Sequence, residues 1–278
     1  MRKVSVKDIT AKVKELCIAA ACHLEPDAAA AIRVASEKEA SPLGREVLAQ
    51  IIKNFEIADA ENVPMCQDTG ISVFFVEAGR GVELDGSLED AINEGVRQGY
   101  KDGYLRKSVC DPLKRTNTGD NTPAIIHTRM VEGDKVKIKF APKGAGSENM
   151  SRLKMLKPSE GVPGIKGFVV EAVREAGGNP CPPIIVGVGI GGDFEQSAIL
   201  AKKALLRPVG GKNLDGDVAG LEEELLKTIN GLGIGPMGFG GTVTALAVHI
   251  ETYPCHIASL PVAVNIQCHA DRHKEAVI

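Results

Sequence analysis

The chain has 278 residues, of which 44% are hydrophobic and 25% charged, a composition typical of a globular protein with one large domain or two closely joined lobes. Its net charge of −3 favours neither a nucleic acid nor an anionic membrane as a partner. No apolar run reaches the roughly 20 residues of a membrane span, and the N-terminus lacks a signal-peptide pattern, so we expect a cytoplasmic protein. Seven cysteines, an odd number, argue against a secreted disulfide framework.

The first 62 residues have the period of amphipathic helices. At helical spacing, one face of the first helix would carry Ile9, Val13, Leu16, Cys17 and Ala20. A second helix is predicted after Pro26, and a third after the break at Ser41-Pro42. We therefore expect a helical part over residues 1–62 and mixed α/β lobes over residues 63–278, all within a single domain.

After residue 63 the apolar period changes, and short β-rich runs alternate with helical stretches. Ser87 opens one helix with a start that resembles a capping box. Residues 132–134 are predicted to form a hairpin turn between two strands. The predicted strands cover residues 71–76, 122–130, 136–140, 183–188, 242–252 and 257–266, and the later helices begin near residues 87, 161, 193 and 221. Because the pattern has no repeat, we expect an α/β fold whose sheets are flanked by helices.

Three cysteines lie in polar, turn-like surroundings: Cys66 in Pro-Met-Cys-Gln-Asp-Thr-Gly, Cys181 in Asn-Pro-Cys-Pro-Pro and Cys268 in Asn-Ile-Gln-Cys-His. Thiols on stiff loops suit a metal or cluster, because the ligands are then placed before the ion arrives. A closed electron-transfer cluster normally takes four protein ligands, so three cysteines on one [4Fe–4S] cube would leave one iron open as a Lewis acid. The remaining cysteines are expected to be small hydrophobic residues: Cys17, Cys22, Cys110 and Cys255.

A glycine-rich stretch, Gly187-Val-Gly-Ile-Gly-Gly192, matches the dinucleotide-binding pattern between a strand and a helix. That site also needs an acidic residue at the end of a second strand, and Asp215, the nearest candidate, lies in a glycine-rich loop with no predicted strand before it. We therefore expect these glycines to permit close packing or to support a cluster loop. A nicotinamide-dependent oxidoreductase is a less favoured alternative, and so is an electron-transfer or cluster-scaffold protein.

Five segments, in order along essentially the whole chain, together resemble the class I, iron–sulfur fumarate hydratases, a family that includes the L-tartrate dehydratase α subunits. They are residues 64–70, Lys143-Gly-Ala-Gly-Ser-Glu-Asn149, residues 179–183, residues 256–264 and Cys268-His269. The resemblance implies a [4Fe–4S] cluster held by Cys66, Cys181 and Cys268, with substrate on the fourth iron.

Candidate acid–base groups flank these ligands. Gln67 and Asp68 follow Cys66 directly, so neither can be far from the cluster; Asp68 suits an acid–base or hydroxyl-orienting role and Gln67 a carboxylate donor. A bare Asp-Thr-Gly pattern is also typical of local turn capping. His256 lies twelve residues before Cys268. A histidine beside an apolar strand is often structural, but the resemblance implies that His256 takes part in proton transfer.

The substrate carboxylates need donors of their own. The resemblance implies that Arg106 faces one carboxylate, which suits a planar, bidentate guanidinium. Gly144 and Gly146 would let backbone N–H groups approach the anion closely, and the sequence leaves open which of the two does so.

Single-chain relatives carry a second domain with further substrate-binding residues, whereas this chain ends at Ile278, soon after the third cysteine. We therefore expect the α subunit of a two-subunit enzyme, active with a separate β subunit in an α2β2-type assembly. The expected substrate is a small dicarboxylate, and the predicted reaction is the reversible hydration of fumarate to (S)-malate. Dehydration of L-tartrate to oxaloacetate is the alternative.

Overall fold

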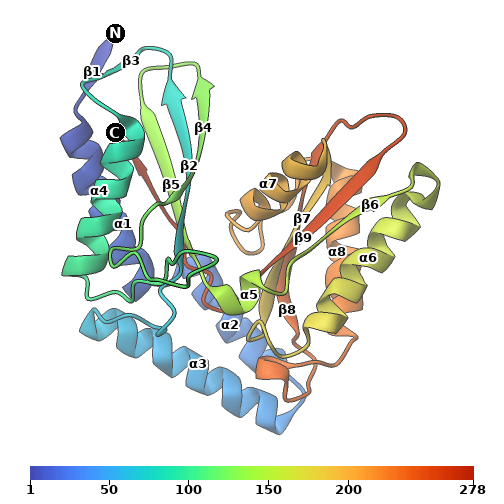
Figure 1. Cartoon of the computed structure of the whole chain (residues 1–278). Coiled ribbons are helices and arrows are strands. Elements are labelled where there is room, and N and C mark those ends of the chain that lie inside the picture. Colours follow the sequence, from blue (N-terminus) through green and yellow to red (C-terminus); the bar gives the residue numbers. More distant parts are fainter. The chain divides into compact units, whose positions relative to one another are not determined.

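The computed structural model describes all 278 residues and confirms the α/β fold class. The chain forms two compact units (Figure 1). The first contains Met1–Glu25, Phe55–Ala145 and Arg272–Ile278, and the second contains Pro26–Asn54 and Gly146–Asp271. The single domain expected from the sequence stays a prediction, because units defined by contacts need not fold independently. None of the helices is long and apolar enough to cross a membrane.

Two helices of the first unit pack tightly on one another: α1 (Val6–Cys22) and α4 (Leu88–Asp102). Helix α1 buries the face predicted from its spacing, and Ser87 caps α4 by accepting a hydrogen bond from the backbone of Asp90 at 3.2 Å. Glycines on α4 permit the close approach, since a Cβ at Gly99 would lie 2.7 Å from the Cβ of Cys17. Substitution of Gly99 would therefore force the two helices apart.

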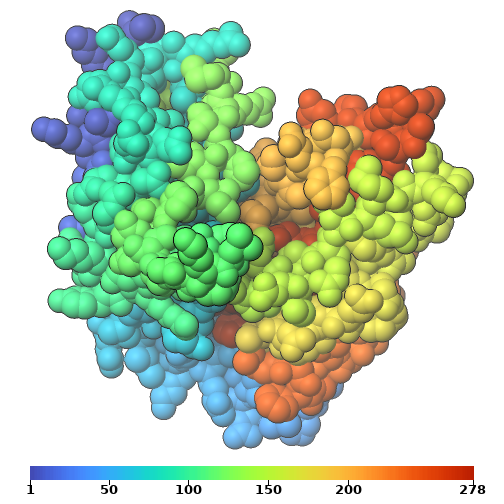
Figure 2. Space-filling view, viewed as in Figure 1, coloured from blue at the N-terminus to red at the C-terminus, as the bar shows by residue number.

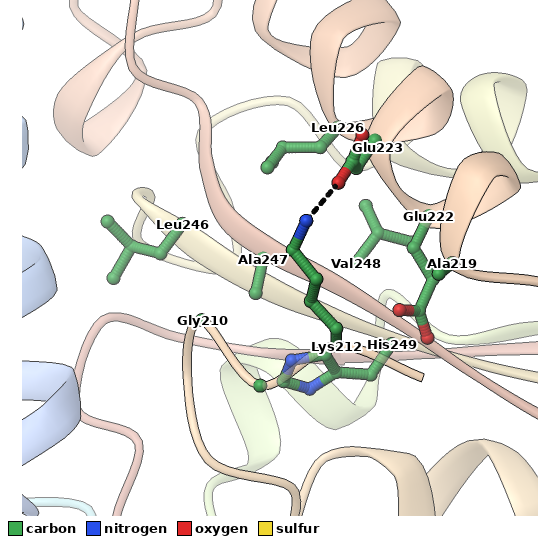
Figure 3. Close-up of a pocket in the computed structure, with 11 residues that line it drawn as sticks. Gly210, Lys212, Ala219, Glu222, Glu223, Leu226, Leu246, Ala247, Val248 and His249 are labelled. Carbon is green, nitrogen blue, oxygen red and sulfur yellow. Dashed lines mark hydrogen bonds and ion pairs between the residues drawn. The ribbon is translucent and has the colours of Figure 1, made fainter. Parts of the chain in front are cut away.

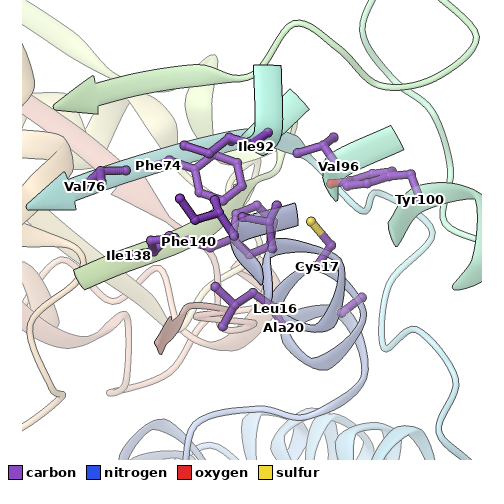
Figure 4. Close-up of a cluster of buried hydrophobic side chains, with 14 of the residues drawn as sticks. Leu16, Cys17, Ala20, Phe74, Val76, Ile92, Val96, Tyr100, Ile138 and Phe140 are labelled. Atoms are coloured by element: carbon purple, nitrogen blue, oxygen red, sulfur yellow. The ribbon is translucent and has the colours of Figure 1, made fainter. Parts of the chain in front are cut away.

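A four-stranded sheet completes the first unit, in the order β10–β5–β2–β4. Its strands are β2 (Ile71–Gly79), β4 (Ile125–Val131), β5 (Val136–Lys143) and β10 (Lys274–Val277). Buried residues alternate along β5, as predicted, and point toward α1 and α4. Figure 4 shows Phe74 and Phe140 in this core, with ring centroids 4.8 Å apart. The short strands β1 (Arg2–Val4) and β3 (Val82–Leu84) pair in parallel beside it.

The predicted hairpin between β4 and β5 is wrong. These strands do not pair, because β2 lies between them, parallel to β4 and antiparallel to β5. The turn at residues 132–134 instead packs against the chain that leaves β2, where the backbone N–H of Gly81 donates to the carbonyl of Gly133 at 2.8 Å. A Cβ at Gly79 would lie 2.5 Å from that carbonyl oxygen, so this packing depends on glycine.

The second unit has its own four-stranded sheet, in the order β6–β9–β7–β8. Its strands are β6 (Arg152–Leu156), β7 (Ile184–Gly191), β8 (Ala245–Tyr253) and β9 (Leu260–Gln267). Strand β7 is parallel to β8 and antiparallel to β9, and it is buried along nearly its whole length. Helices on both faces account for this burial.

Helices α6 (Gly161–Ala176) and α8 (Gly216–Asn230) cover one face of this sheet, and α7 (Phe194–Ala204) covers the other (Figure 1). Asp193 caps α7 by accepting from the backbone of Gln196 at 2.8 Å. The glycine-rich stretch lies beneath α7: a Cβ at Gly187 would lie 2.2 Å from the carbonyl oxygen of Ala201, and one at Gly189 would lie 2.0 Å from that of Ser197. The predicted close packing is therefore confirmed.

A buried carboxylate between helices α2 (Pro26–Lys38) and α3 (Pro42–Glu61) binds the segment that leads into β8. Glu39 is 1% exposed and accepts hydrogen bonds from the backbone N–H groups of Ser41, Thr242 and Val243. Burial alone would raise the pKa of Glu39, but these hydrogen bonds lower it overall. Sequence analysis missed this contact, because its partners are about 200 residues apart.

Several short elements were also not predicted from the sequence. They are β1, β3, β6, β10, α5 (Ala145–Glu148) and the 3₁₀ turns η1 (Pro158–Glu160) and η2 (Pro236–Gly238).

Candidate active site

The first unit carries Cys66, Gln67 and Asp68 on the loop between α3 and β2. The backbone N–H of Met65 donates to the carbonyl of Ala21 at 3.0 Å, which ties this loop to the end of α1. Cys66 is a free, half-buried thiol, and its Sγ donates to Oε1 of Gln67 at 3.6 Å. The thiol is thus partly accessible on an anchored loop.

Two backbone amides fix the carboxylate of Asp68. Oδ1 accepts from the N–H of Gly70 at 2.9 Å, and Oδ2 accepts from the N–H of Ala145 at 2.8 Å. Gly70 has a φ of +78°, and a Cβ there would lie 2.7 Å from the backbone nitrogen of Lys143. Glycine is therefore required for the loop to pass so close to the end of β5. At this place Asp68 accepts its second hydrogen bond, from the N–H of Ala145.

Hydrogen bonds also join the Asp68 loop to the segment that carries Arg106. The hydroxyl of Thr69 donates to the carbonyl of Arg106 at 2.8 Å, and the buried hydroxyl of Tyr100 donates to the carbonyl of Thr69 at 2.6 Å. Asn121 donates to the carbonyl of Gly70 at 3.2 Å. These roles of Thr69, Tyr100 and Asn121 were not predicted from the sequence.

Arg106 lies on the segment between α4 and β4, which Figure 2 shows in green on the surface of the first unit. The Arg106 side chain is exposed, whereas its backbone is held by Thr69. The guanidinium thus extends from a fixed point toward solvent, where it is able to meet an incoming anion.

The two candidate glycines have different neighbours. A Cβ at Gly144 would lie 3.2 Å from Oδ2 of Asp68, so Gly144 lies directly beside the fixed carboxylate of the first unit. Gly146 belongs to the second unit, where a Cβ would lie 3.7 Å from the carbonyl oxygen of Asn179. Gly144 is therefore the glycine that adjoins the candidate acid–base group.

The second unit holds the other two candidate ligands on adjoining turns. Register pairs Ile185 near the start of β7 with Gln267 at the end of β9, so Cys181 and Cys268 lie at the same end of the sheet. The backbone N–H of His269 donates to the carbonyl of Cys181 at 3.4 Å, and its Nδ1 lies 3.1 Å from the same oxygen. Both cysteines are half-buried and neither forms a disulfide, and Cys181 has a φ of +57°.

His256 lies on the loop between β8 and β9, and its side chain is exposed. Its Nδ1 accepts a hydrogen bond from the backbone of Ala258 at 3.1 Å. The eight residues of β9 separate this loop from Cys268 by about 25 Å. Within the second unit, therefore, His256 is not brought together with Cys181 and Cys268.

The remaining cysteines divide into two kinds. Cys17 and Cys22 are buried, and burial raises the pKa of both thiols, as expected of small hydrophobic residues. Cys110 is half-buried, and the prediction is wrong for Cys255, which is exposed and donates to the carbonyl of Ser259 at 3.3 Å. Cys255 lies on the loop just beyond the end of β8.

No group of three or more His, Cys, Asp or Glu side chains forms a metal site in this structure. The donors nevertheless fit an iron–sulfur cluster in kind, since Cys66, Cys181 and Cys268 are half-buried cysteines on loops and none of them forms a disulfide. Cys66 belongs to the first unit and the other two to the second. The cluster therefore stays a prediction.

A separate cavity of about 130 Å³ lies in the second unit, between residues 210–212, α8 and β8 (Figure 3). Lys212 and Glu223 form an ion pair of 3.1 Å at its edge. His249 lines the cavity, is 2% exposed, and has no hydrogen-bond partner for Nδ1. Burial, with a smaller contribution from Arg207, lowers the pKa of His249 to about 4, although Glu222 opposes the shift.

This histidine is expected to make the protein sensitive to acid. Because the pKa of His249 is lower in the folded chain than in the unfolded one, stability is intact above about pH 6.5 and falls as pH drops toward 4. At pH 5 the loss should be roughly 2 kcal/mol. Urea unfolding at pH 7 and pH 5 measures it. His249→Gln should lose correspondingly less stability over this interval, and an unchanged loss in this variant would contradict the assignment.

Comparison with known proteins agrees with the resemblance seen in the sequence. The model of the fumarate hydratase (fumerase) family matches residues 10–277. A Methanocaldococcus jannaschii protein named "Putative L(+)-tartrate dehydratase subunit alpha" is 48% identical over 267 residues, which are 94% of each chain. Proteins named "L(+)-tartrate dehydratase subunit alpha" from Escherichia coli strain K12 and Shigella sonnei strain Ss046 are each 32% identical over 275 residues, 98% of this chain and 91% of theirs.

The chain therefore belongs to the fumarate hydratase family, a family of hydro-lyases. The three relatives named above match it along more than nine-tenths of their own length, and their names are those of L(+)-tartrate dehydratase α subunits.

Proposed function

We propose that this protein is the α subunit of an iron–sulfur hydro-lyase that dehydrates L-tartrate to oxaloacetate together with a separate β subunit. The observation that carries the proposal is the 48% identity, over 94% of both chains, to a relative named as a tartrate dehydratase α subunit. Fumarate hydration, the reaction first predicted from the sequence, is the second candidate, and the description of the matching family model favours it. Family membership counts against a nicotinamide-dependent oxidoreductase.

In this proposal, Cys66, Cys181 and Cys268 hold a [4Fe–4S] cluster. When bound, the cluster supplies a Lewis-acidic iron for the substrate hydroxyl that leaves as water. Support comes from the half-buried state of the three cysteines, none of which forms a disulfide, and from the hydrogen bonds of His269 that hold the turns of Cys181 and Cys268 together. The cytoplasmic location stays a prediction.

Asp68 is the proposed acid–base group. Dehydration removes a proton from one carbon and a hydroxyl from its neighbour, so a carboxylate must be held in one orientation near the reacting carbon. The hydrogen bonds from Gly70 and Ala145 hold Asp68 in this way. Each of the two carboxylate oxygens accepts one of these hydrogen bonds and keeps a second lone pair, with which it can accept a proton.

The remaining predicted residues bind the substrate. Gln67 and Arg106 would donate to the two carboxylates, and the backbone beside Gly144 adjoins the oriented Asp68. His256 lies at the far end of β9 from Cys268, so a part in proton transfer at that cluster requires a histidine from another copy of the chain. An α2β2-type assembly has a second α chain that could provide it.

The α–β complex, purified without oxygen, is expected to turn over L-tartrate with negligible activity on malate and fumarate. The assay compares initial rates on the three acids at equal concentrations. Efficient malate dehydration with little tartrate turnover would favour the second candidate. Substrate-dependent reduction of a nicotinamide by an iron-free complex would contradict both.

A further inference from the structure

One cation of the first unit is buried with two of its nitrogens unpartnered. Arg272 is 1% exposed, and its Nε and Nη1 atoms have no hydrogen-bond partner. A guanidinium keeps its charge at any pH that the folded chain tolerates, and leaving N–H donors of a charged group buried without acceptors is unfavourable. Arginines with structural roles in this chain are paired: Arg207 binds Glu222 at 2.6 Å, and Arg45 donates to the carbonyl of Glu39 at 2.8 Å.

The groups around Arg272 in the first unit leave its Nε and Nη1 atoms without acceptors. A Cβ at Gly144 would lie 3.7 Å from Nη2 of Arg272 and 3.2 Å from Oδ2 of Asp68, so Gly144 adjoins both the guanidinium and the carboxylate. The Asp68 carboxylate accepts hydrogen bonds from backbone amides. Burial raises the pKa of Tyr100, another neighbour of Arg272, so its phenol carries no charge.

We propose that Arg272 binds one carboxylate of the dicarboxylate substrate, beside Gly144 and Asp68. The inference deepens the proposed function and rests on it. A carboxylate is the anion that best matches a guanidinium, because it accepts two parallel N–H bonds. It would supply the acceptors that Nε and Nη1 lack.

In this assignment, two arginines bind the substrate, one at each carboxylate. A diacid has two carboxylates, and the exposed side chain of Arg106 suits the one that arrives from solvent. The buried Arg272 suits the one that lies deeper, next to the acid–base group. A side chain in place of Gly144 would occupy the space between Asp68 and Arg272.

The test uses the α–β complex with Arg272→Lys and Arg272→Gln, and Arg129→Gln as a matched control on an exposed arginine of the same unit. Binding of succinate, a diacid without a hydroxyl, is followed by the rise it causes in the melting temperature, and KM is measured for L-tartrate. Both Arg272 variants should weaken succinate binding and raise KM by roughly 10- to 100-fold, while the control matches the wild type.

A second measurement separates binding from a structural role. Without diacid, Arg272→Gln should melt no lower than the wild type, because it removes buried N–H donors that lack acceptors. Lower melting together with an unchanged response to succinate would overturn the proposal. Loss of iron and sulfide with unchanged succinate affinity would also overturn it, since Arg272 would then serve the cluster. If the wild type binds succinate through Arg272 but fails to dehydrate tartrate, the proposed reaction fails and the binding site stands.

Discussion

Replacing Cys181 with serine is expected to abolish cluster binding and to lower turnover by more than about 100-fold, while the second unit keeps its fold. Serine offers a hard, protonated hydroxyl where a soft thiolate is needed, so two cysteines would be left to hold the cluster. The fold should survive because Cys181 is half-buried on a turn, and its carbonyl still accepts from His269. Iron and acid-labile sulfide analysis, with circular dichroism, measures both effects.

Cys110→Ser is the matched control for this experiment. Cys110 is also half-buried and forms no disulfide. Its backbone pairs with that of Asn117 in an isolated antiparallel β-bridge, which does not depend on the sulfur. The control should keep the iron content and the activity of the wild type. A Cys181→Ser protein that retained both its iron and its turnover would remove Cys181 from the proposed ligand set.

Replacing Asp68 with asparagine should lower kcat by about 10²- to 10⁴-fold, the usual contribution of a positioned acid–base group, with the iron content unchanged. Asparagine is nearly the same size, but it cannot take up a proton from the substrate. Its amide nitrogen would also face the N–H of Gly70 or Ala145, so one of the two hydrogen bonds that orient the side chain would be lost.

Asp85→Asn is the control for Asp68, because Asp85 also accepts a backbone hydrogen bond, from Val6 at 2.7 Å, but lies on the exposed side of the first unit. It should change kcat by less than about twofold. Anaerobic rates are normalised to iron content. If Asp68→Asn lost its iron and its activity in proportion, the role of Asp68 would be to maintain the cluster and not to transfer protons.

The helices were predictable because their signals are local. The spacing of Ile9, Val13 and Leu16 indicates a buried face, and Ser87 and Asp193 mark helix starts by accepting backbone hydrogen bonds. Alternation along β5 was readable for the same reason. Each of these signals lies within the element that it defines.

Strand order was not predictable in this way. The β4–β5 turn has the local features of a hairpin, but β2, more than 40 residues earlier in the chain, occupies the place between the two strands. The pairing of β10 with β5 likewise joins the last residues of the chain to its middle. These strand pairings depend on how the whole sheet packs. The pattern within one short strand is too brief to specify which strand will pair with it.

The candidate site shows the same division. Cys66, Asp68 and Cys268 lie in short motifs that the sequence displays directly. Two other features depend on contacts that form only when the chain folds. They are the hydrogen bond from the Thr69 hydroxyl to the Arg106 carbonyl, and the Nε and Nη1 atoms of Arg272 that have no partner. The motifs also do not distinguish the two candidate substrates, because tartrate and malate differ by only one hydroxyl. Comparison along the whole chain was needed to favour tartrate.

The most direct test of this account is iron and acid-labile sulfide analysis of the α–β complex, prepared without oxygen and followed spectroscopically while L-tartrate is added. We expect about four irons and four sulfides for each α chain, with an iron signal that changes as substrate binds. A complex that dehydrates tartrate at full rate without iron, or whose cluster signal ignores the substrate, would contradict the claim that Cys66, Cys181 and Cys268 hold a cluster with one open iron.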